Sequence, residues 1–395
     1  MRNVEAKAMG ERKYSLLFVQ PGVAWQSVPS IERQGLQITR ALRERGYDVT
    51  WSPILVRPPE REQDISLIRL ARQDGFAVVP LYLPEKCNLI RSARRFGEHV
   101  RRIDCDIVCV TGYKAGIVSA WADLKPTVEV LHGWTGHTVA VRLYEFLDKL
   151  FLPRHDLIIA ISPLQREIAI RYGVLPDRAW WIPNAMDIAC LPPPMPASEW
   201  QSRLGLPADS VLIAGVGRLS PEKGYRYLVE AFATVTEAYP RAHLLLAGDG
   251  IERHRLQSEI TRLGLQQCVT MLGEIPNGAQ LISALHLLVN PSLSEGMPNV
   301  VLEAFAYKTP VVATAVGGVP ELVKDGETGW LVPPRDPHAL AQAIRDALSN
   351  PEEARRRAEN AYRHLLANFT VEQQVERWEQ ALHAAVENWQ RRRRR

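Results

Sequence analysis

Short apolar runs alternate with helical patterns along most of this chain, and this alternation restricts the possible folds more than any other feature. In the first half, runs with strand character lie at 14–20, 47–55, 77–83, 107–111, 127–131 and 157–161. Continuous apolar runs of this length are typical of parallel strands that are buried on both faces. Strand, helix and strand within about 40 residues make a βαβ unit. The first half therefore predicts a doubly wound parallel sheet.

The second half repeats the pattern after a proline-rich segment at 191–196. Its predicted strands lie at 211–216, 243–247, 269–272, 287–290 and 310–314, and one long helical pattern begins at 371. A chain of 395 residues is too long for one core of ordinary size. We predict an α/β protein with Rossmann-like domains over 1–190 and 191–370. Residues 371–395 form a C-terminal helix that packs back on the first domain and ends in a basic tail.

Composition narrows the class of protein. The net charge is +4, and the arginines at 391–395 supply more than this excess, so charge does not indicate nucleic-acid binding. The 5 cysteines (87, 105, 109, 190 and 268) lack zinc-site spacing and predict free thiols in a reducing compartment. No signal-peptide core or apolar stretch of about 18 residues is present. We expect a cytoplasmic protein, and peripheral membrane contact stays open.

A first cluster of functional candidates follows the strand at 211–216. Glycines at the end of this strand allow a ligand to approach the backbone closely. Arg218 and Lys223 come next, at the start of a helical pattern. Two cations at a helix start suit a diphosphate. Taken alone, the segment is weak evidence for a ligand site and fits a solvated turn with an ordinary ion pair better.

A second cluster occupies 291–304, where a loop leads into a helix. We expect Pro298 at the first helical position, Glu295 in the loop and Glu303 inside the helix. A helix N-terminus can hold phosphate, and a carboxylate one or two turns further on can accept two hydrogen bonds from a ribose diol. Apolar neighbours argue against a surface position for Glu303, and a buried carboxylate needs a partner.

Glu295 and Glu303, with seven residues between them, resemble the EX7E motif of retaining family 4 glycosyltransferases. Arg218 and Lys223 match the diphosphate clamp of that family, GR-x(4)-KG. Further similar segments are LHG at 131–133, IPNAMD at 182–187, LAGDG at 246–250, AVGGVPE at 315–321 and DGETGWLV at 325–332. The resemblance runs from about 14 to 369 and is strongest in the second half. It implies the GT-B fold, in which two Rossmann-like domains face an interdomain cleft.

The resemblance also implies roles for single residues. Arg218 and Lys223 would neutralise the donor diphosphate, Glu303 would hold the ribose, and Glu295 would contact the donor sugar near its 3-position. His132 would reach across the cleft to the donor sugar and completes the implied catalytic set. The other implied donor-binding residues are Gly22, Glu274, Ile275, Gly296, Met297, Pro298, Asn299 and Val300.

The resemblance further implies transfer with retention of the anomeric configuration, by front-face attack without a protein nucleophile. The leaving phosphate would take the acceptor proton, so catalysis would be charge stabilisation and positioning. No cofactor and no metal is expected. The donor would be a UDP-, GDP- or ADP-sugar and the acceptor a glycan or a lipid-linked molecule, in polysaccharide or glycolipid biosynthesis. The alternatives are another GT-B enzyme, such as an epimerase or a phosphorylase, and a non-catalytic binding or scaffolding protein.

Several segments depart from the family pattern or suggest other chemistry. The N-terminal loop at 21–27 has one glycine where the family has a pair, and Ala185 replaces the glycine of the PNGVD motif. Asp104-Cys105-Asp106 spells a DxD metal motif, but we expect Asp106 to start a strand. The helix at 89–102 is amphipathic and arginine-rich. We expect it to pack on its own sheet; contact of this helix and the arginine tail with anionic lipid is the alternative.

Overall fold

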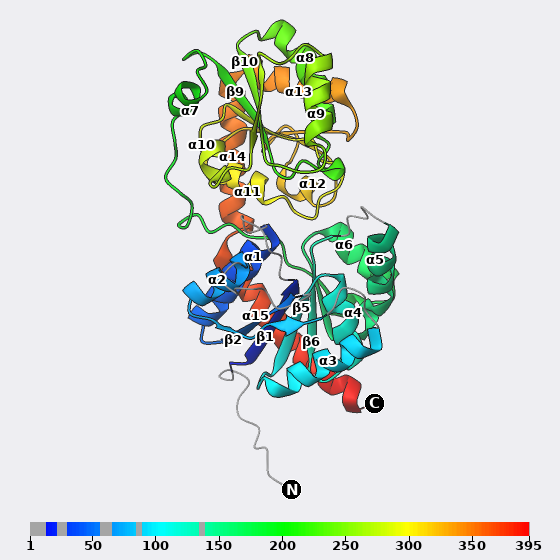
Figure 1. Cartoon of the computed structure of the whole chain (residues 1–395). Helices are drawn as coiled ribbons and strands as arrows, with labels where there is room; N and C mark the ends of the chain where they lie inside the picture. Colours follow the sequence, from blue (N-terminus) through cyan, green and yellow to red (C-terminus); the bar gives the residue numbers. More distant parts are fainter. Residues whose placement is uncertain (1–12, 22–29, 56–64, 84–88, 134–138, 395) are drawn as a thin grey trace. The chain divides into compact units, whose positions relative to one another are not determined.

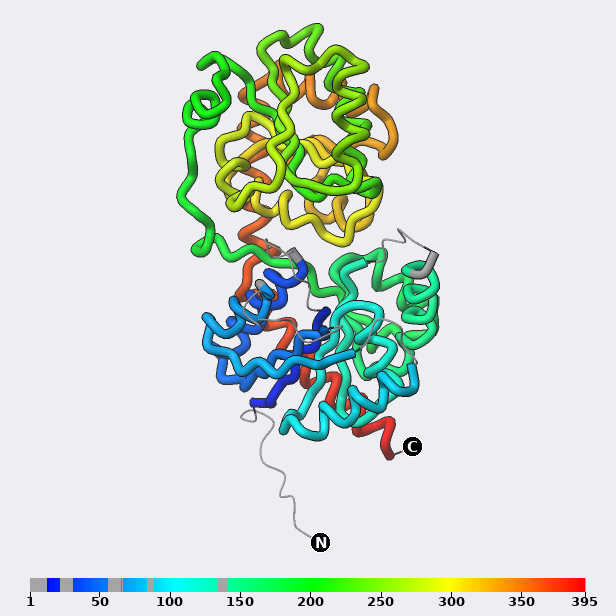
Figure 2. The backbone as a smooth tube through the Cα atoms, viewed as in Figure 1, coloured from blue at the N-terminus to red at the C-terminus, as the bar shows by residue number. Residues whose placement is uncertain are grey.

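The computed structural model describes residues 13–21, 30–55, 65–83, 89–133 and 139–394. The chain divides into two compact units. Unit 1 comprises Met1–Ala160, Arg166–Trp181 and Val375–Arg395, and unit 2 comprises Ile161–Gln165 and Ile182–Gln374. Figure 1 shows the elements of each unit, and Figure 2 traces the backbone through them. Within the described residues, no helix has the length and apolarity that a membrane crossing needs.

Unit 1 is built on a parallel sheet. Its strands are β1 (Ser15–Pro21), β2 (Asp48–Leu55), β3 (Ala77–Val78), β4 (Leu81–Tyr82), β5 (Ile107–Thr111), β6 (Thr127–Leu131), β7 (Leu157–Ala160) and β8 (Ala179–Trp181). The strand order is β3-β2-β1-β5-β6-β7-β8, with β4 paired to β2. The single strand expected at 77–83 is thus two short strands. Pro80 lies between them and has no N–H to donate, which interrupts the ladder.

Helices connect most of the strands of this sheet. They are α1 (Ser30–Glu44), α2 (Ser66–Gln73), α3 (Leu89–Arg102), α4 (Tyr113–Ala122), α5 (Val139–Phe151), α6 (Pro163–Arg171) and α15 (Val371–Arg394). In α3, Phe96 and Val100 are buried in one cluster with Val108 of β5. The apolar face of this arginine-rich helix therefore packs on its own sheet, as expected.

Unit 2 repeats the architecture with six parallel strands. These are β9 (Val211–Val216), β10 (Ala242–Ala247), β11 (Val269–Gly273), β12 (Leu287–Asn290), β13 (Val311–Thr314) and β14 (Trp330–Val332), in the order β11-β10-β9-β12-β13-β14. Its helices are α7 (Ala197–Arg203), α8 (Tyr225–Ala238), α9 (Arg253–Arg262), α10 (Gly278–Ser283), α11 (Asn299–Ala306), α12 (Val319–Leu322), α13 (Pro337–Ser349) and α14 (Pro351–Asn368). The strands expected from the sequence are all present, with ends shifted by a residue or so.

The two units divide between Trp181 and Ile182, earlier than the boundary at 190 that the proline-rich segment suggested. The reason is hydrogen bonding, because the backbone N–H of Met186 donates to the Phe369 carbonyl in unit 2 at 2.9 Å. Helix α15 begins in unit 2 and belongs to unit 1 from Val375 onward.

The arginines expected as a basic tail instead continue α15 to Arg394. Arg392 forms ion pairs with Asp123 at 2.6 Å and with the fully buried Asp156 at 3.1 Å. Arg393 also pairs with Asp123. These contacts hold the end of the helix on unit 1, because a buried carboxylate such as Asp156 requires a counter-charge. Arg392 and Arg393 are therefore part of the folded unit.

Unit 1 also encloses a cluster of ionisable side chains. Glu129, in the middle of β6, lies with its Oε2 atom 3.0 Å from Nε2 of His155, and both side chains are almost fully buried. Asp148 of α5 hydrogen-bonds to Glu129. Burial raises the pKa of Glu129 to about 8, which the Asp148 hydrogen bond partly opposes. Burial lowers the pKa of His155 to about 4. Around pH 7 Glu129 therefore keeps its proton and the His155 imidazole is neutral.

We expect Glu129→Gln to stabilise the protein increasingly as the pH rises. The folded wild type keeps the Glu129 proton up to about pH 8, whereas an ordinary glutamate releases it near 4.5. The free energy of unfolding of the wild type therefore falls across this window, and glutamine has no proton to lose. The advantage should reach about 1–3 kcal/mol at pH 8. Urea unfolding at pH 5 and pH 8 measures it. Glu237→Gln, at an exposed position, should show no such trend; a pH-independent difference for Glu129→Gln would contradict the assignment.

Candidate functional site

The strand order of each sheet contains one point at which it reverses. In unit 2 the sequence order runs outward from β9 in one direction and from β12 in the other. Ligands of open parallel sheets bind outside the carboxyl ends of the strands at such a switch point. The loop after β9 carries Arg218 and Lys223, and the loop after β12 carries Glu295. The structure therefore brings both predicted clusters to the place where this fold binds ligands.

These two loops touch backbone to backbone. The N–H of Leu293 donates to the carbonyl of Glu222 at 2.7 Å. Gly224 has a φ of +66°, and a Cβ atom at this position would lie 2.2 Å from the carbonyl oxygen of Pro291. Only glycine satisfies both the left-handed backbone and the close approach. The glycine after Lys223 thus serves to join the two loops.

A third loop, after β13, closes on the Glu295 segment. The N–H of Gly318 donates to the Gly296 carbonyl at 2.9 Å. A Cβ atom on Gly317, which has a φ of +53°, would lie only 1.7 Å from the carbonyl oxygen of Glu295. The loop after β10 is the fourth loop at this edge. Its Asp249 carbonyl accepts a hydrogen bond at 2.9 Å from the N–H of Leu219 in the loop after β9. Four loops at the carboxyl edge of the sheet therefore position the candidate residues together.

Lys223 and Glu295 form the centre of this edge. The ammonium Nζ of Lys223 lies 2.6 Å from Oε1 of Glu295, and the hydroxyl of Ser292 donates to the same oxygen at 2.6 Å. The Glu295 side chain is 9% exposed and that of Lys223 is 24% exposed. The resemblance assigned the two residues to different parts of the donor, whereas here they pair with each other. A ligand phosphate would compete with Glu295 for the Lys223 ammonium.

Glu303 lies in the second turn of α11, half-buried, while its neighbours Leu302 and Ala304 are fully buried. The core contacts of these neighbours fix the helix, and Glu303 stays partly exposed on it. Pro298 was expected at the first helical position, but it directly precedes the helix. Its ψ of 113° is extended, so α11 begins at Asn299.

Sequence reasoning assigned no role to three residues of this site. The side-chain amide of Asn184 donates to the carbonyl of Met297 at 3.2 Å and to Oδ1 of Asn299 at 3.0 Å. Ser292 holds Glu295, as described above. Tyr225 is buried, and burial together with the charge of Glu295 raises its pKa. Asn184 belongs to the IPNAMD segment, so the motif signalled its presence and the tertiary contact reveals what it does.

The remaining predicted residues are distributed as follows. Glu274 and Ile275 directly follow β11, and the N–H of Gly248 donates to the carbonyl of the adjoining Gly273 at 2.7 Å. Gly296 and Val300 are partly exposed beside the buried Met297. Gly22, and with it most of the unusual loop at 21–27, lies outside the described residues.

His132 and Asp106 belong to unit 1. His132 directly follows β6 and is half-buried, and burial lowers its pKa to about 4, so the imidazole is neutral at pH 7. The carboxylate of Asp106 accepts a hydrogen bond from the N–H of Ser15 at 3.1 Å. This contact joins the start of β1 to the start of β5, which confirms the expected structural role of Asp106. Of the cysteines, Cys105, Cys109, Cys190 and Cys268 are free thiols, and Cys87 lies outside the described residues.

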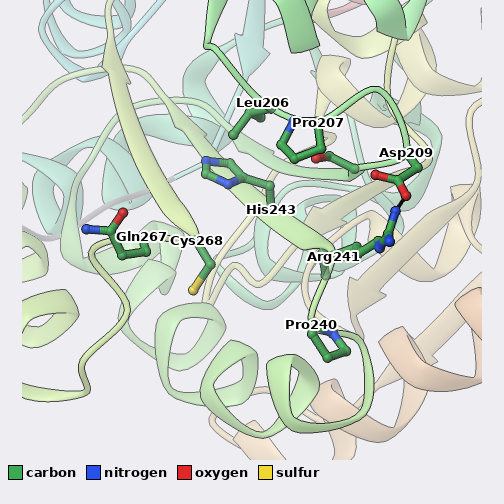
Figure 3. A pocket seen from close by; sticks show the side chains of 10 residues that line it. Leu206, Pro207, Asp209, Pro240, Arg241, His243, Gln267 and Cys268 are labelled. Atoms are coloured by element: carbon green, nitrogen blue, oxygen red, sulfur yellow. Dashed lines mark ion pairs between the residues drawn. The ribbon is translucent and has the colours of Figure 1, made fainter.

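A separate pocket of about 410 Å³ lies in unit 2 and is shown in Figure 3. Its lining includes Ser210, Ala242 and Cys268, which stand at the amino ends of β9, β10 and β11. Arg241 pairs with Asp209 there, and Nε2 of His243 lies 2.8 Å from Oγ1 of Thr270. The pocket is at the opposite edge of the sheet from Arg218 and Glu295, and its charges neutralise each other. It is therefore distinct from the candidate site.

Comparison with known proteins identifies the family. Residues 197–364 match the model described as glycosyl transferases group 1, and residues 31–189 match the model described as Glycosyltransferase Family 4. The lipopolysaccharide core biosynthesis mannosyltransferase LpcC of Rhizobium leguminosarum bv. viciae is 32% identical over 244 residues, which are 60% of this chain and 67% of LpcC. The chain belongs to glycosyltransferase family 4.

Other relatives of this family 4 chain agree with the assignment. The alpha-D-kanosaminyltransferase of Streptomyces kanamyceticus is 37% identical over 42% of this chain, and the match spans less than half of that relative, 43%. The crystal structure of Anabaena HepE in complex with UDP-glucose superposes with a TM-score of 0.80 over 94% of this chain and 100% of HepE, at 24% identity. This likeness confirms the GT-B fold with its two Rossmann-like domains.

Proposed function

We propose that this chain transfers a sugar from a nucleotide diphosphate sugar to a glycan or lipid-linked acceptor, in polysaccharide or glycolipid biosynthesis. The observation that carries the proposal is the group of loops at the switch point of unit 2, which brings Lys223 within 2.6 Å of Glu295. The names of the relatives support it, since LpcC is a mannosyltransferase of lipopolysaccharide core biosynthesis. HepE has been crystallised with UDP-glucose, which supports a nucleotide-sugar donor.

Each residue then has a defined task. Lys223 exchanges its Glu295 partner for the donor diphosphate, and Arg218 adds a second positive charge. Glu295, released from Lys223, accepts hydrogen bonds from the hydroxyls of the donor sugar. Glu303 accepts hydrogen bonds from the ribose, and the N-terminal turn of α11 directs its N–H groups at the phosphate. Glu274 and Ile275 contact the base through their backbone. The family resemblance also assigns Gly22 to the diphosphate and His132, a neutral imidazole at pH 7, to the donor sugar.

The chemical step follows from these charges. The bond between the anomeric carbon and the phosphate oxygen breaks, and the cations stabilise the negative charge that develops on the diphosphate. The acceptor hydroxyl attacks from the same face, its proton passes to the leaving phosphate, and the configuration is retained. No protein nucleophile, cofactor or metal takes part in this scheme. Peripheral contact with an anionic membrane would bring a lipid-linked acceptor to the enzyme.

The test is a screen of UDP-, GDP- and ADP-sugars for hydrolysis and transfer, with calorimetric titration of the corresponding nucleotides with and without Mg²⁺. One of these nucleotides should bind, and its affinity should be the same when a chelator removes the Mg²⁺. The anomeric configuration of the product, followed by NMR, should match that of the donor. Absence of binding by every nucleotide would refute the proposal, and an inverted product would refute the retaining step.

Glu303→Ala should weaken donor binding by about 10- to 100-fold, because each hydrogen bond to a carboxylate contributes roughly 1.5–3 kcal/mol. Calorimetry with the donor and with the isolated nucleotide measures this loss. Folding should survive, since the apolar neighbours of Glu303 hold α11 in the core. The matched control is Glu237→Ala, at an exposed position in the last turn of α8, which should bind donor like the wild type. Unchanged binding by Glu303→Ala would refute the ribose assignment.

A further inference from the structure

Helix α5 of unit 1 has an inverted distribution of side chains. Leu143, Phe146 and Leu150 are 58%, 49% and 51% exposed, whereas Glu145 and Asp148 are 6% and 2% exposed. The three apolar residues are spaced by three and four positions, so they form one stripe along the helix, which we call the α5 stripe. In an ordinary surface helix the leucines would face the core and the carboxylates would face water. The α5 stripe therefore requires an explanation other than packing in unit 1.

Buried contacts fix this orientation. Asp148 joins the cluster of Glu129 and His155 under the helix. Burial raises the pKa of Tyr113 on the adjoining α4, and the charge of Glu145 raises it further. The ring of Tyr113 stacks on Tyr144 of α5 with centroids 5.8 Å apart. Rotating the helix to bury the α5 stripe would break all of these contacts, so the exposure of the stripe is built into the fold.

The surface around the α5 stripe is aromatic and basic. Trp121, at the end of α4, is 45% exposed and stacks on Phe151 at the end of α5 with centroids 5.8 Å apart. The guanidinium of Arg154 lies over the Phe151 ring at 5.2 Å. Arg142 is exposed next to Leu143. Both acidic residues of α5 are buried, so the outward face of the helix combines apolar side chains with positive charge. Figure 1 shows α5 at the edge of unit 1, beside α4 and α6.

We propose that the α5 stripe docks unit 1 on an anionic lipid surface. Leucine and phenylalanine side chains enter the boundary between headgroups and acyl chains, and tryptophan is favoured at that depth. Arg142 and Arg154 are positioned to meet lipid phosphates, which attract basic residues near the surface. This inference rests on the proposed peripheral contact and names the surface that makes it. Of the other surfaces suggested by the sequence, the apolar face of α3 packs on its own sheet, and Arg392 and Arg393 pair with Asp123.

A second copy of the chain is the competing occupant of this surface. A symmetric dimer through α5 would place the same basic residues on both sides of the interface, because a two-fold axis pairs identical patches. Arg142 and Arg154 would then meet like charges, with both carboxylates of the helix turned inward. A lipid surface supplies the opposite charge instead. Charge complementarity therefore favours the membrane over self-association.

Flotation of the full-length protein with phosphatidylcholine vesicles, with and without phosphatidylglycerol, tests the proposal. The wild type should float with the anionic vesicles, and added salt should weaken this binding. Leu143→Ser/Leu150→Ser should lower the partition coefficient about tenfold or more, since two half-exposed leucines no longer enter the lipid. Arg142→Glu/Arg154→Glu should abolish the preference for the anionic vesicles. Leu143→Ser/Leu150→Ser should keep the wild-type melting temperature, because both side chains are about half-exposed. The melting temperature of the arginine variant is measured beside it, because this variant also loses the contact of Arg154 with the Phe151 ring.

The matched control is Ile90→Ser/Leu366→Ser, which changes two apolar residues that are 64% and 43% exposed on α3 and α14. This control should float like the wild type. The proposal is overturned if the wild type does not bind anionic vesicles, if the control loses binding as strongly as the α5 variant, or if light scattering shows a dimer that the α5 variant dissociates. The assay contains neither donor nor acceptor. A wild-type protein that binds a nucleotide but no vesicles would therefore reject the membrane surface alone. A wild-type protein that binds anionic vesicles but no nucleotide would reject the proposed transferase function.

Discussion

Arg218→Ala should reduce sugar transfer by about 100- to 1,000-fold, the usual effect of removing one preorganised group that stabilises developing charge. Arg218 is exposed, and the loops after β9 and β10 hold its backbone at the carboxyl edge of the sheet. In the proposed reaction the guanidinium stabilises the negative charge that develops on the leaving diphosphate. Initial rates at saturating acceptor, together with calorimetric donor affinity, measure the loss. If the charge acts mainly in the transition state, the rate of transfer should fall by a larger factor than the donor affinity.

The fold should survive this substitution, because a substitution at an exposed position changes stability by only about 0.5 kcal/mol. Lys223→Ala is a less direct test, since it also removes the positively charged partner of the Glu295 carboxylate, which is 9% exposed. The control for Arg218→Ala is Arg355→Ala, which removes an equal charge from an exposed position on α14. Arg355→Ala should transfer like the wild type. Normal transfer by Arg218→Ala would remove Arg218 from the proposed mechanism.

Gly317→Ala should inactivate the enzyme, although Gly317 itself has no contact with the donor in the proposed scheme. The new methyl group would lie 1.7 Å from the Glu295 carbonyl oxygen, so the loop after β12 has to move. A displacement of about 1 Å at a reacting centre can cost roughly 100-fold in rate. The left-handed backbone, with a φ of +53°, adds about 1–2 kcal/mol of strain. We therefore expect activity to fall at least about 100-fold, measured as initial rate beside the urea unfolding curve.

Gly326→Ala separates the two effects. Gly326 has a φ of +77°, and a Cβ atom there would meet nothing within 4 Å. This variant should therefore lose about 1–2 kcal/mol of stability from backbone strain and retain its activity. Equal activity losses in the two glycine variants would show that general destabilisation, and not displacement of the Glu295 loop, accounts for the result with Gly317.

Part of the fold and of the candidate site could be predicted from the sequence alone. The strand at 211–216, the strand at 287–290 and the residues that follow them were predictable, because apolar runs and glycine-containing turns are local signals. The residue types at Arg218, Lys223, Glu295 and Glu303 also indicated a sugar diphosphate ligand before any coordinates. The family matches confirm the class of protein that this pattern suggested.

Other features could not be read from the chain. The pairing of Lys223 with Glu295 joins residues on two different loops, and the contact of Asn184 with Met297 joins segments still further apart. The break at Pro80 was visible as a residue, but its effect depends on which neighbouring strand requires the missing N–H. Arg392 and Arg393 appeared to belong to a tail because their partners Asp123 and Asp156 lie far away in sequence.

The sequence by itself determined the alternation of strands and helices, the repetition of that pattern in two halves and the residue types of the candidate donor site. These depend on local periodicity and on motifs a few residues long. Only the tertiary structure decided which loops interlock at the switch point and which face of α5 is turned outward. In α5 the apolar pattern alone would have buried Leu143 and Leu150. The buried partners of Asp148 turn the helix the other way, because an ionisable side chain in the core needs a polar partner there.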